Sequence, residues 1–156
     1  MAKTYTQLYI QFVFSVKGRN SIIPKQHKKQ VQQYVTKIIQ ERKHKVIAIN
    51  MMPDHIHIFV GLNPSQSFDN LVNHIQFISA KYIRQQPWMK SKFRWQDGYG
   101  AFSYSRSHID SVMKYINNQE QHHTKQTFKA EYLNFLNKFE VEYKEENLFE
   151  FYKNLY

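Results

Sequence analysis

Apolar and polar residues alternate in four segments of the chain, a period of two that is typical of strands with one face in a core. The first segment covers residues 7–16 and the last covers residues 99–105. The two between them, residues 45–52 and 55–62, are separated by a proline and an aspartate, which favour a tight turn. We therefore expect these two strands to form an antiparallel hairpin.

Apolar residues recur at helical spacing in the segments between and after these strands. Pro24 opens the first such segment, Ser67 is a candidate N-cap of the second, and Ser107 with Asp110 resembles a capping box before the third. The predicted helices cover residues 24–42, 67–85, 108–121 and 127–139.

The order strand, helix, strand, strand, helix, strand predicts an α+β fold, a ferredoxin-like sandwich with an antiparallel sheet and additional C-terminal helices. The length of 156 residues is usual for one domain, and 42% of the residues are hydrophobic, enough for one core. We expect a single domain over residues 1–156. Its core should span about residues 6–121, followed by a C-terminal helical extension over about residues 122–156.

Charge suggests what this domain binds. The chain has 22 Lys and Arg against 12 Asp and Glu, a formal net charge of +10, and half of the acids lie after residue 130. This balance favours a polyanionic partner such as nucleic acid or an anionic membrane surface. A basic surface that only keeps the protein soluble remains the alternative.

The cysteine content and the hydropathy of the chain exclude several kinds of site and of protein. The chain has no cysteine, which excludes disulfides, thiolate metal sites and cysteine nucleophiles. The N-terminus lacks an apolar signal core, and no apolar run reaches the ~20 residues that a membrane-spanning helix needs. We expect a cytoplasmic protein with no membrane association.

Two histidines two positions apart are candidate metal ligands. His55 and His57 lie within a predicted strand, so both imidazoles should project from one face while Ile56 enters the core on the other. Neutral imidazole suits a divalent ion. Because the chain has eight histidines, such a spacing also arises by chance, and the motif alone is weak.

Tyr115 and Gln119 form a second pair of candidates. They are four residues apart on a predicted helix, so the hydroxyl and the amide share one face. A tyrosine on a helix is more often a packing residue than a functional one, and the chain has 11 of them. The adjacent His122 and His123 point in different directions on a helix, so we expect a solvated helix end or a DNA contact there and not a metal pair.

Basic residues interleaved with aromatic ones suggest a path for a single strand, because cations follow phosphates and aromatic faces stack on bases. We expect Trp95, one of these aromatics, to be structural. Asp54 is expected to be a turn residue and not a ligand. The candidate DNA-binding residues are Lys81, Arg84, Lys90, Lys92, Arg94 and Arg106.

Three motifs follow one another along the chain. They are Met52-Pro53-Asp54-His55-Ile56-His57, the segment Phe93-Arg94-Trp95-Gln96-Asp97-Gly98-Tyr99-Gly100-Ala101-Phe102-Ser103, and Tyr115 with Gln119. In these motifs and their order the chain resembles, over about residues 6–121, the single-tyrosine HUH transposases of small bacterial insertion sequences, the IS200-like transposase family.

The resemblance implies an activity and a set of roles. Tyr115 would be the nucleophile, and His55, His57 and Gln119 would bind Mg²⁺ or Mn²⁺. The protein would cleave and rejoin single-stranded DNA with hairpin ends through a 5′-phosphotyrosine intermediate, as a homodimer and without ATP. The tyrosine helix of one subunit would complete the metal site of the other.

The chemistry can be argued apart from the family. A tyrosine hydroxyl titrates near pH 10, so its attack on a phosphodiester requires a cation at the scissile phosphate. Two imidazoles and one amide supply no negative charge and leave positions open for phosphate oxygens. A non-catalytic ferredoxin-like nucleic-acid-binding module and a domesticated single-tyrosine nickase remain alternatives.

Overall fold

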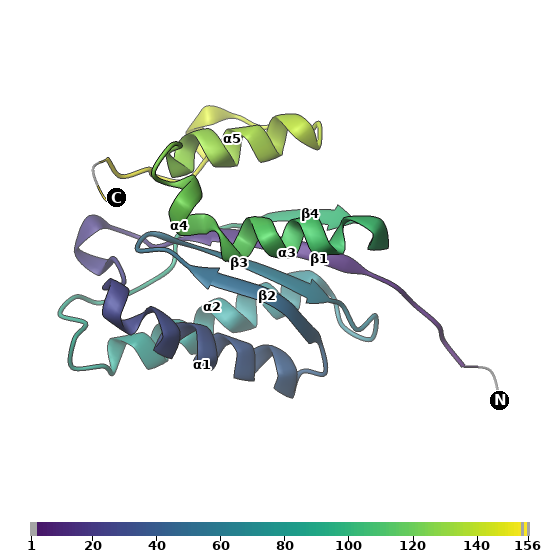
Figure 1. Cartoon of the computed structure of the whole chain (residues 1–156). Coiled ribbons are helices and arrows are strands. Elements are labelled where there is room, and N and C mark those ends of the chain that lie inside the picture. Colours follow the sequence, from purple (N-terminus) through teal and green to yellow (C-terminus); the bar gives the residue numbers. More distant parts are fainter. Residues whose placement is uncertain (1–2, 154, 156) are drawn as a thin grey trace.

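The computed structural model, which describes residues 3–153 and 155, is built on one four-stranded antiparallel sheet (Figure 1). The strands are β1 (Tyr9–Ser15), β2 (Lys45–Met51), β3 (His55–Gly61) and β4 (Gly100–Tyr104). The principal helices are α1 (Lys28–Glu41), α2 (Phe68–Arg84), α3 (Ile109–Asn117), α4 (Gln119–His122) and α5 (Phe128–Lys138).

The strand order is β2-β3-β1-β4, so the expected β2–β3 hairpin pairs with β1, and β4 pairs with the other side of β1. β3 lies in the middle, with His57 opposite Val13 of β1 on one side and Asn50 of β2 on the other. With α1 between β1 and β2 and α2 between β3 and β4, the topology is that of a ferredoxin-like sandwich. The predicted α+β fold is therefore confirmed.

The two faces of the sheet are covered by different helices. α1 and α2 pack on one face, whereas α3 and α5 lie over the other (Figure 1). Ile56, Ile58 and Val60 of β3 are fully buried in the main core with the apolar stripes of α1 and α2. Phe59, which points the opposite way, packs under Val112 of α3.

Helix boundaries follow the predicted caps in part. The Ser67 hydroxyl accepts a hydrogen bond from the backbone N–H of Asn70 at 3.1 Å, which confirms the N-cap of α2. A 3-10 turn, Lys25–His27, comes before α1, so that helix begins after the predicted Pro24. The predicted capping box is wrong. Ser107 lies in the 3-10 turn Arg106–His108, and no side chain caps the start of α3.

The C-terminal extension is only partly helical. The Thr127 hydroxyl caps α5 by accepting from the backbone N–H of Ala130 at 3.1 Å. After α5, the residues that the structure describes are irregular apart from the 3-10 turn Glu145–Asn147, and this tail returns to the core at Gln96. The Gln96 side chain accepts from the backbone N–H of Glu150 at 2.7 Å and donates to its carbonyl oxygen at 2.9 Å. This contact fixes the tail against the sheet.

Hydropathy of the helices agrees with the absence of an apolar run in the sequence. Among the described residues, no helix has both the length and the apolar character needed to cross a membrane.

Candidate active site

Strand β3 presents two buried imidazoles on the face that α3 and α5 cover. His55 and His57 are both fully buried, and their ring centroids lie 5.2 Å apart. The intervening Ile56 points into the core beneath α1 and α2. The alternation of a strand therefore brings the two histidines together, as the sequence predicts.

Each imidazole is oriented by a second polar side chain. His55 Nδ1 lies 2.7 Å from the Asp54 carboxylate, and His57 Nδ1 lies 2.7 Å from the amide oxygen of Gln11 on β1. Because an imidazole that donates from Nδ1 presents a free lone pair at Nε2, these contacts suit both rings for ligation. Asp54 lies at the hairpin turn as predicted, and it also orients His55.

Tyr115 and Gln119 reach the same site from α3 and α4. The predicted helix over residues 108–121 is broken, since α3 ends at Asn117 and α4 begins at Gln119. Gln119 is fully buried, and its Oε1 lies 3.5 Å from His55 Nε2. The Tyr115 ring lies 6.2 Å from the His57 ring. All four residues that the sequence singled out therefore lie in one cluster.

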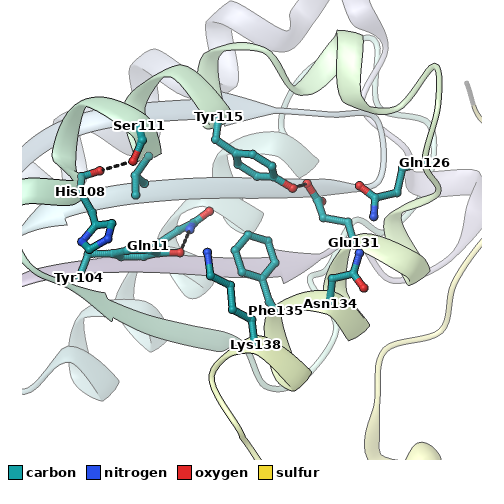
Figure 2. Close-up of a pocket in the computed structure, with 11 residues that line it drawn as sticks. Gln11, Tyr104, His108, Ser111, Tyr115, Gln126, Glu131, Asn134, Phe135 and Lys138 are labelled. Atoms are coloured by element: carbon teal, nitrogen blue, oxygen red, sulfur yellow. Dashed lines mark hydrogen bonds between the residues drawn. The ribbon is translucent and has the colours of Figure 1, made fainter.

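A glutamate that sequence reasoning missed lies at the centre of this cluster. Glu131 of α5 is buried, and its Oε1 lies 3.0 Å from His57 Nε2 and 3.5 Å from His55 Nε2. Its Oε2 accepts hydrogen bonds from the Tyr115 hydroxyl and, at 2.9 Å, from the Gln119 amide. One carboxylate thus contacts both candidate ligands on β3 and the candidate nucleophile. Figure 2 shows its hydrogen bond with Tyr115.

The sequence carries a signal for Glu131. Phe128 and Phe135 lie three residues before and four residues after it, so the glutamate occupies the apolar stripe of its own helix. A carboxylate on the buried side of a helix requires partners of opposite charge or hydrogen-bond donors. It is therefore a candidate site residue even without a recognised motif.

The expectation of a solvated helix end at His122 and His123 is wrong. After the break at Asn118, α4 leads from α3 toward α5 (Figure 1), and His123 is buried with its Nε2 3.0 Å from Gln119 Oε1. His123 Nε2 also lies 3.3 Å from Glu131 Oε1. His122 stacks on Tyr115 with ring centroids 4.4 Å apart. The two adjacent side chains do point in different directions, but His122 contacts Tyr115 and His123 contacts Gln119 and Glu131, so both lie at the site.

Burial and neighbouring charges shift the pKa values of this cluster. Burial lowers the pKa of His55, but Asp54 and Glu131 outweigh it and raise that pKa to about 9. Burial prevails for His57 and lowers its pKa. Burial disfavours an ionised Glu131, but the histidines around it hold its pKa well below its usual range. Burial, followed by the charge of Glu131, raises the pKa of Tyr115.

The residues present fit a divalent cation. One ligand atom from each of His55, His57 and Glu131 lies within 4.8 Å of the other two. Gln119 Oε1 is a further oxygen donor beside His55. Imidazole nitrogens together with carboxylate and amide oxygens suit a divalent ion. Glu131 adds a negative charge to a ligand set that we expected to be neutral.

The candidate DNA-binding residues are exposed but not gathered at this site. Lys81 and Arg84 lie on α2, across the sheet from the histidines (Figure 1). Arg84 donates to the backbone oxygen of Phe93 at 3.0 Å. Lys90, Lys92 and Arg94 lie in the loop before β4, and Arg106 lies in the 3-10 turn before α3.

Trp95 has the structural role that we expected. Its indole N–H donates to the Ser79 hydroxyl at 2.9 Å, and its ring packs edge-on against Phe14 at 4.8 Å and Phe93 at 5.1 Å. Trp95 is buried, so it offers no face to a nucleic-acid base.

A hollow of about 350 Å³ opens beside Tyr115 between α3 and α5. Tyr104, Tyr115 and Phe135 supply its aromatic walls, and Glu131 lies at its edge beside the Tyr115 hydroxyl (Figure 2). The side chain of Tyr115, the candidate nucleophile, therefore borders an open space.

The profile of one protein family, described as "Transposase IS200 like", matches residues 4–119 of the chain. The chain belongs to this family. Membership in the IS200-like transposases places it among DNA-cleaving enzymes and agrees with the resemblance seen in its motifs. His123 and Glu131 lie beyond the matched residues.

Individual relatives agree with the family and the fold. The chain is 24% identical to the ISDra2 transposase TnpA of Deinococcus radiodurans over 118 residues, which cover 72% of this chain and 84% of that protein. A crystal structure from Deinococcus radiodurans superposes with a TM-score of 0.57 at 20% identity, covering 76% of this chain and 98% of that one. A REP-associated tyrosine transposase bound to a REP hairpin superposes with a TM-score of 0.59 at 14% identity, covering 79% and 73%.

Proposed function

We propose that this protein cleaves and rejoins single-stranded DNA through a covalent bond between Tyr115 and a 5′ phosphate. The observation that carries the proposal is the position of the Tyr115 hydroxyl. It is held by Glu131 beside His55 and His57, and it borders a hollow that is open to substrate. A tyrosine with only a packing role has no need of a buried carboxylate and two oriented imidazoles.

His55, His57 and Glu131, together with the amide oxygen of Gln119, would hold a divalent ion such as Mg²⁺ or Mn²⁺. When bound, the ion would supply positive charge to the scissile phosphate and balance the charge of Glu131. Asp54 and Gln11 hold the imidazoles so that both Nε2 atoms face the shared centre. The protein therefore prepares the ligand geometry before substrate arrives.

Tyr115 would attack the phosphorus in line with the bond to the leaving 3′ oxygen. The bond between the tyrosine oxygen and phosphorus forms as the bond between phosphorus and the 3′ oxygen breaks. Glu131 Oε2, which already accepts the Tyr115 hydrogen bond, is the nearest acceptor for the phenol proton. The leaving oxygen takes up a proton and becomes a 3′ hydroxyl. Attack by another 3′ hydroxyl reverses these changes, so rejoining requires no ATP.

The proposed substrate is single-stranded DNA with hairpins near the ends of the element. The net charge of +10 supports a polyanionic partner. The REP-associated transposase that shares this fold is bound to a DNA hairpin. We propose that Lys81, Arg84, Lys90, Lys92, Arg94 and Arg106 provide phosphate contacts for such DNA.

A denaturing gel tests the nucleophile and the metal together. Purified protein is incubated with Mg²⁺ and labelled single strands from both flanks of its gene. Wild type should give a covalent protein–DNA band, whereas Tyr115→Phe and His57→Ala should give none. Tyr143→Phe, which changes an exposed tyrosine outside the site, is the matched control and should keep the band. Strand binding without an adduct would indicate a non-catalytic nucleic-acid-binding module.

The expected homodimer, with active sites shared between subunits, stays a prediction. In this structure Tyr115 contacts Glu131 of its own chain, which is compatible with a site formed within one subunit. A mixture of Tyr115→Phe and His57→Ala proteins separates the two arrangements. Adduct formation by the mixture would support shared sites, and an inactive mixture would support sites within one subunit.

A further inference from the structure

We infer that the hollow between α3 and α5 binds a single nucleotide of the DNA strand, the one joined to the scissile phosphate. This inference rests on the proposed function, because it takes Tyr115 to be the nucleophile. Tyr115 forms part of the wall of the hollow. A phosphate within reach of the Tyr115 oxygen must therefore place one of its two attached nucleosides in or beside this space.

The size of the hollow limits what it can hold. Its volume of about 350 Å³ is near the lower end of the ~300–1,000 Å³ usual for small-molecule pockets. Such a space accommodates one base and its sugar, and it is too small for a stack of several nucleotides. The DNA strand can therefore place only one nucleotide in the hollow beside Tyr115, and the nucleotides before and after it must lie outside.

The walls offer aromatic surface of the kind that a base requires. Phe135 of α5 stacks on Phe102 at 5.1 Å, and it meets the Tyr115 ring edge-on at 5.8 Å. Tyr104 of β4 is held from behind, since its hydroxyl accepts a hydrogen bond from the Gln11 amide at 2.9 Å. These rings are fixed by their neighbours before a ligand binds. Aromatic faces stack on all four bases, so this part of the hollow fits DNA of any sequence.

Polar groups complete the match to a nucleotide. The Lys138 amino group points into the hollow beside Phe135 (Figure 2). Within the described residues it forms no ion pair, so its charge is available to a phosphate. The side-chain amides of Gln126 and Asn134 line the same space, and within the described part of the chain neither has a hydrogen-bonding partner. A side-chain amide both donates and accepts, as recognition of a base edge requires.

The hollow is lined both by residues within the family match and by residues that follow it. Tyr104 and Tyr115 are among residues 4–119, whereas Gln126, Asn134 and Lys138 come after them. Preference for the base beside the cut would therefore be set by α5 and the turn before it.

Photo-crosslinking tests the inference without requiring cleavage. Tyr115→Phe protein is mixed with single strands in which 5-iododeoxyuridine replaces one nucleotide at a time along the whole strand. Irradiation joins that base to an aromatic side chain in contact with it, and mass spectrometry identifies the peptide. We expect one position to give a cross-link to Tyr104 or Phe135. Cross-links that map only to other surfaces, from every position of the strand, would overturn the inference.

A matched pair of lysines on α5 tests the phosphate contact. Lys138→Ala should weaken binding about fivefold and reduce the slope of log K against log salt by about one. Lys129→Ala is the control, because that exposed lysine is nine residues earlier and so about two and a half turns away, on the opposite side of the helix. Equal effects of the two variants would indicate general attraction to DNA and would contradict a nucleotide site.

The two proposals fail in distinguishable ways. An adduct formed by wild type, with no cross-link in the hollow, would overturn the nucleotide site and leave the nicking mechanism. A cross-link in the hollow with no adduct from wild type would overturn the mechanism and leave a nucleotide-binding site. The cross-links use Tyr115→Phe alone, so they remain informative if Lys138→Ala is unstable, and Lys138→Gln then provides the charge test.

Discussion

The two faces of β3 are equally buried and differ in what fills them. On one face Ile56 and Ile58 pack against the apolar sides of α1 and α2. On the other face His55 and His57 contact Glu131 and are oriented by polar side chains. Burial of the first face stabilises the fold through apolar contact. Burial of the second removes polar groups from water, so each requires a hydrogen bond or a cation.

This difference shows how one strand serves both stability and chemistry. Because side chains alternate, substitution at an even-numbered position of β3 should affect mainly folding, and substitution at residue 55 or 57 should affect mainly the site. The sheet also holds the two histidines on a rigid element, which fixes the distance between their nitrogens. The following predictions test how completely the two faces are separated.

The largest expected effect is on the polar face. His57→Ala removes one proposed ligand and should lower the rate of adduct formation by more than about a hundredfold. Mutation of residues that only orient a metal ligand already lowers metal affinity or activity by about 10–100-fold. Gel assays over a range of Mg²⁺ concentrations measure the rate, and thermal unfolding shows whether the fold survives. A His57→Ala protein with unchanged metal-dependent activity would show that the cation, if required, is held elsewhere.

Ile58→Ala should affect the opposite face by creating a cavity in the core, and it should cost about 2–5 kcal/mol in the free energy of unfolding. Denaturant titration measures the loss. Mn²⁺ binding by the fraction that remains folded, followed by calorimetry, should match wild type. A weaker Mn²⁺ affinity in folded Ile58→Ala protein would mean that the two faces are coupled through the strand.

Asp54→Asn should have a smaller effect, because it changes the residue that orients His55, a proposed ligand, and not the proposed ligand itself. We expect Mn²⁺ affinity to fall by about 10–100-fold, since the carboxylate that orients His55 loses its charge. Asp97→Asn, at an exposed aspartate outside the site, is the control. Equal affinities for the two variants would restrict Asp54 to its role in the hairpin turn.

The smallest expected effect concerns pH. In the metal-free protein the pKa of His55 is raised to about 9, so its protonated form stabilises the fold fully below about pH 6.5. This stabilisation is lost as pH rises through 9. In EDTA, the melting temperature of wild type should fall by several degrees more than that of Asp54→Asn between pH 6 and pH 9.5. Parallel falls for the two proteins would contradict a charged contact between Asp54 and His55.

Much of the fold was predictable because its signals are local. The alternation in β3 placed both histidines on one face, and the hydroxyl of Ser67 caps α2 as its sequence position indicates. The break between α3 and α4 was not predictable from spacing, since residues 108–121 have a continuous helical pattern. That break decides where Gln119 and His123 point, and so it hid the role of His123.

The role of Glu131 was hidden for a different reason. It lies 74 residues from His57 in sequence, and no spacing rule connects a strand to a helix that far away. Its position between Phe128 and Phe135 indicates burial, but burial alone does not name the partners. Only the folding of α5 back over the sheet joins this carboxylate to the histidines and to Tyr115.

The position of Glu131 beyond residue 119 has a genetic consequence. A stop codon between residues 122 and 130 would leave the whole segment that matches the family, including His55, His57, Tyr115 and Gln119. The product would lack Glu131, the carboxylate that holds the Tyr115 hydroxyl. Copies of such a gene can therefore keep the whole matched segment and still lack a residue of the proposed active site. A survey of active copies should therefore check that the reading frame continues through α5.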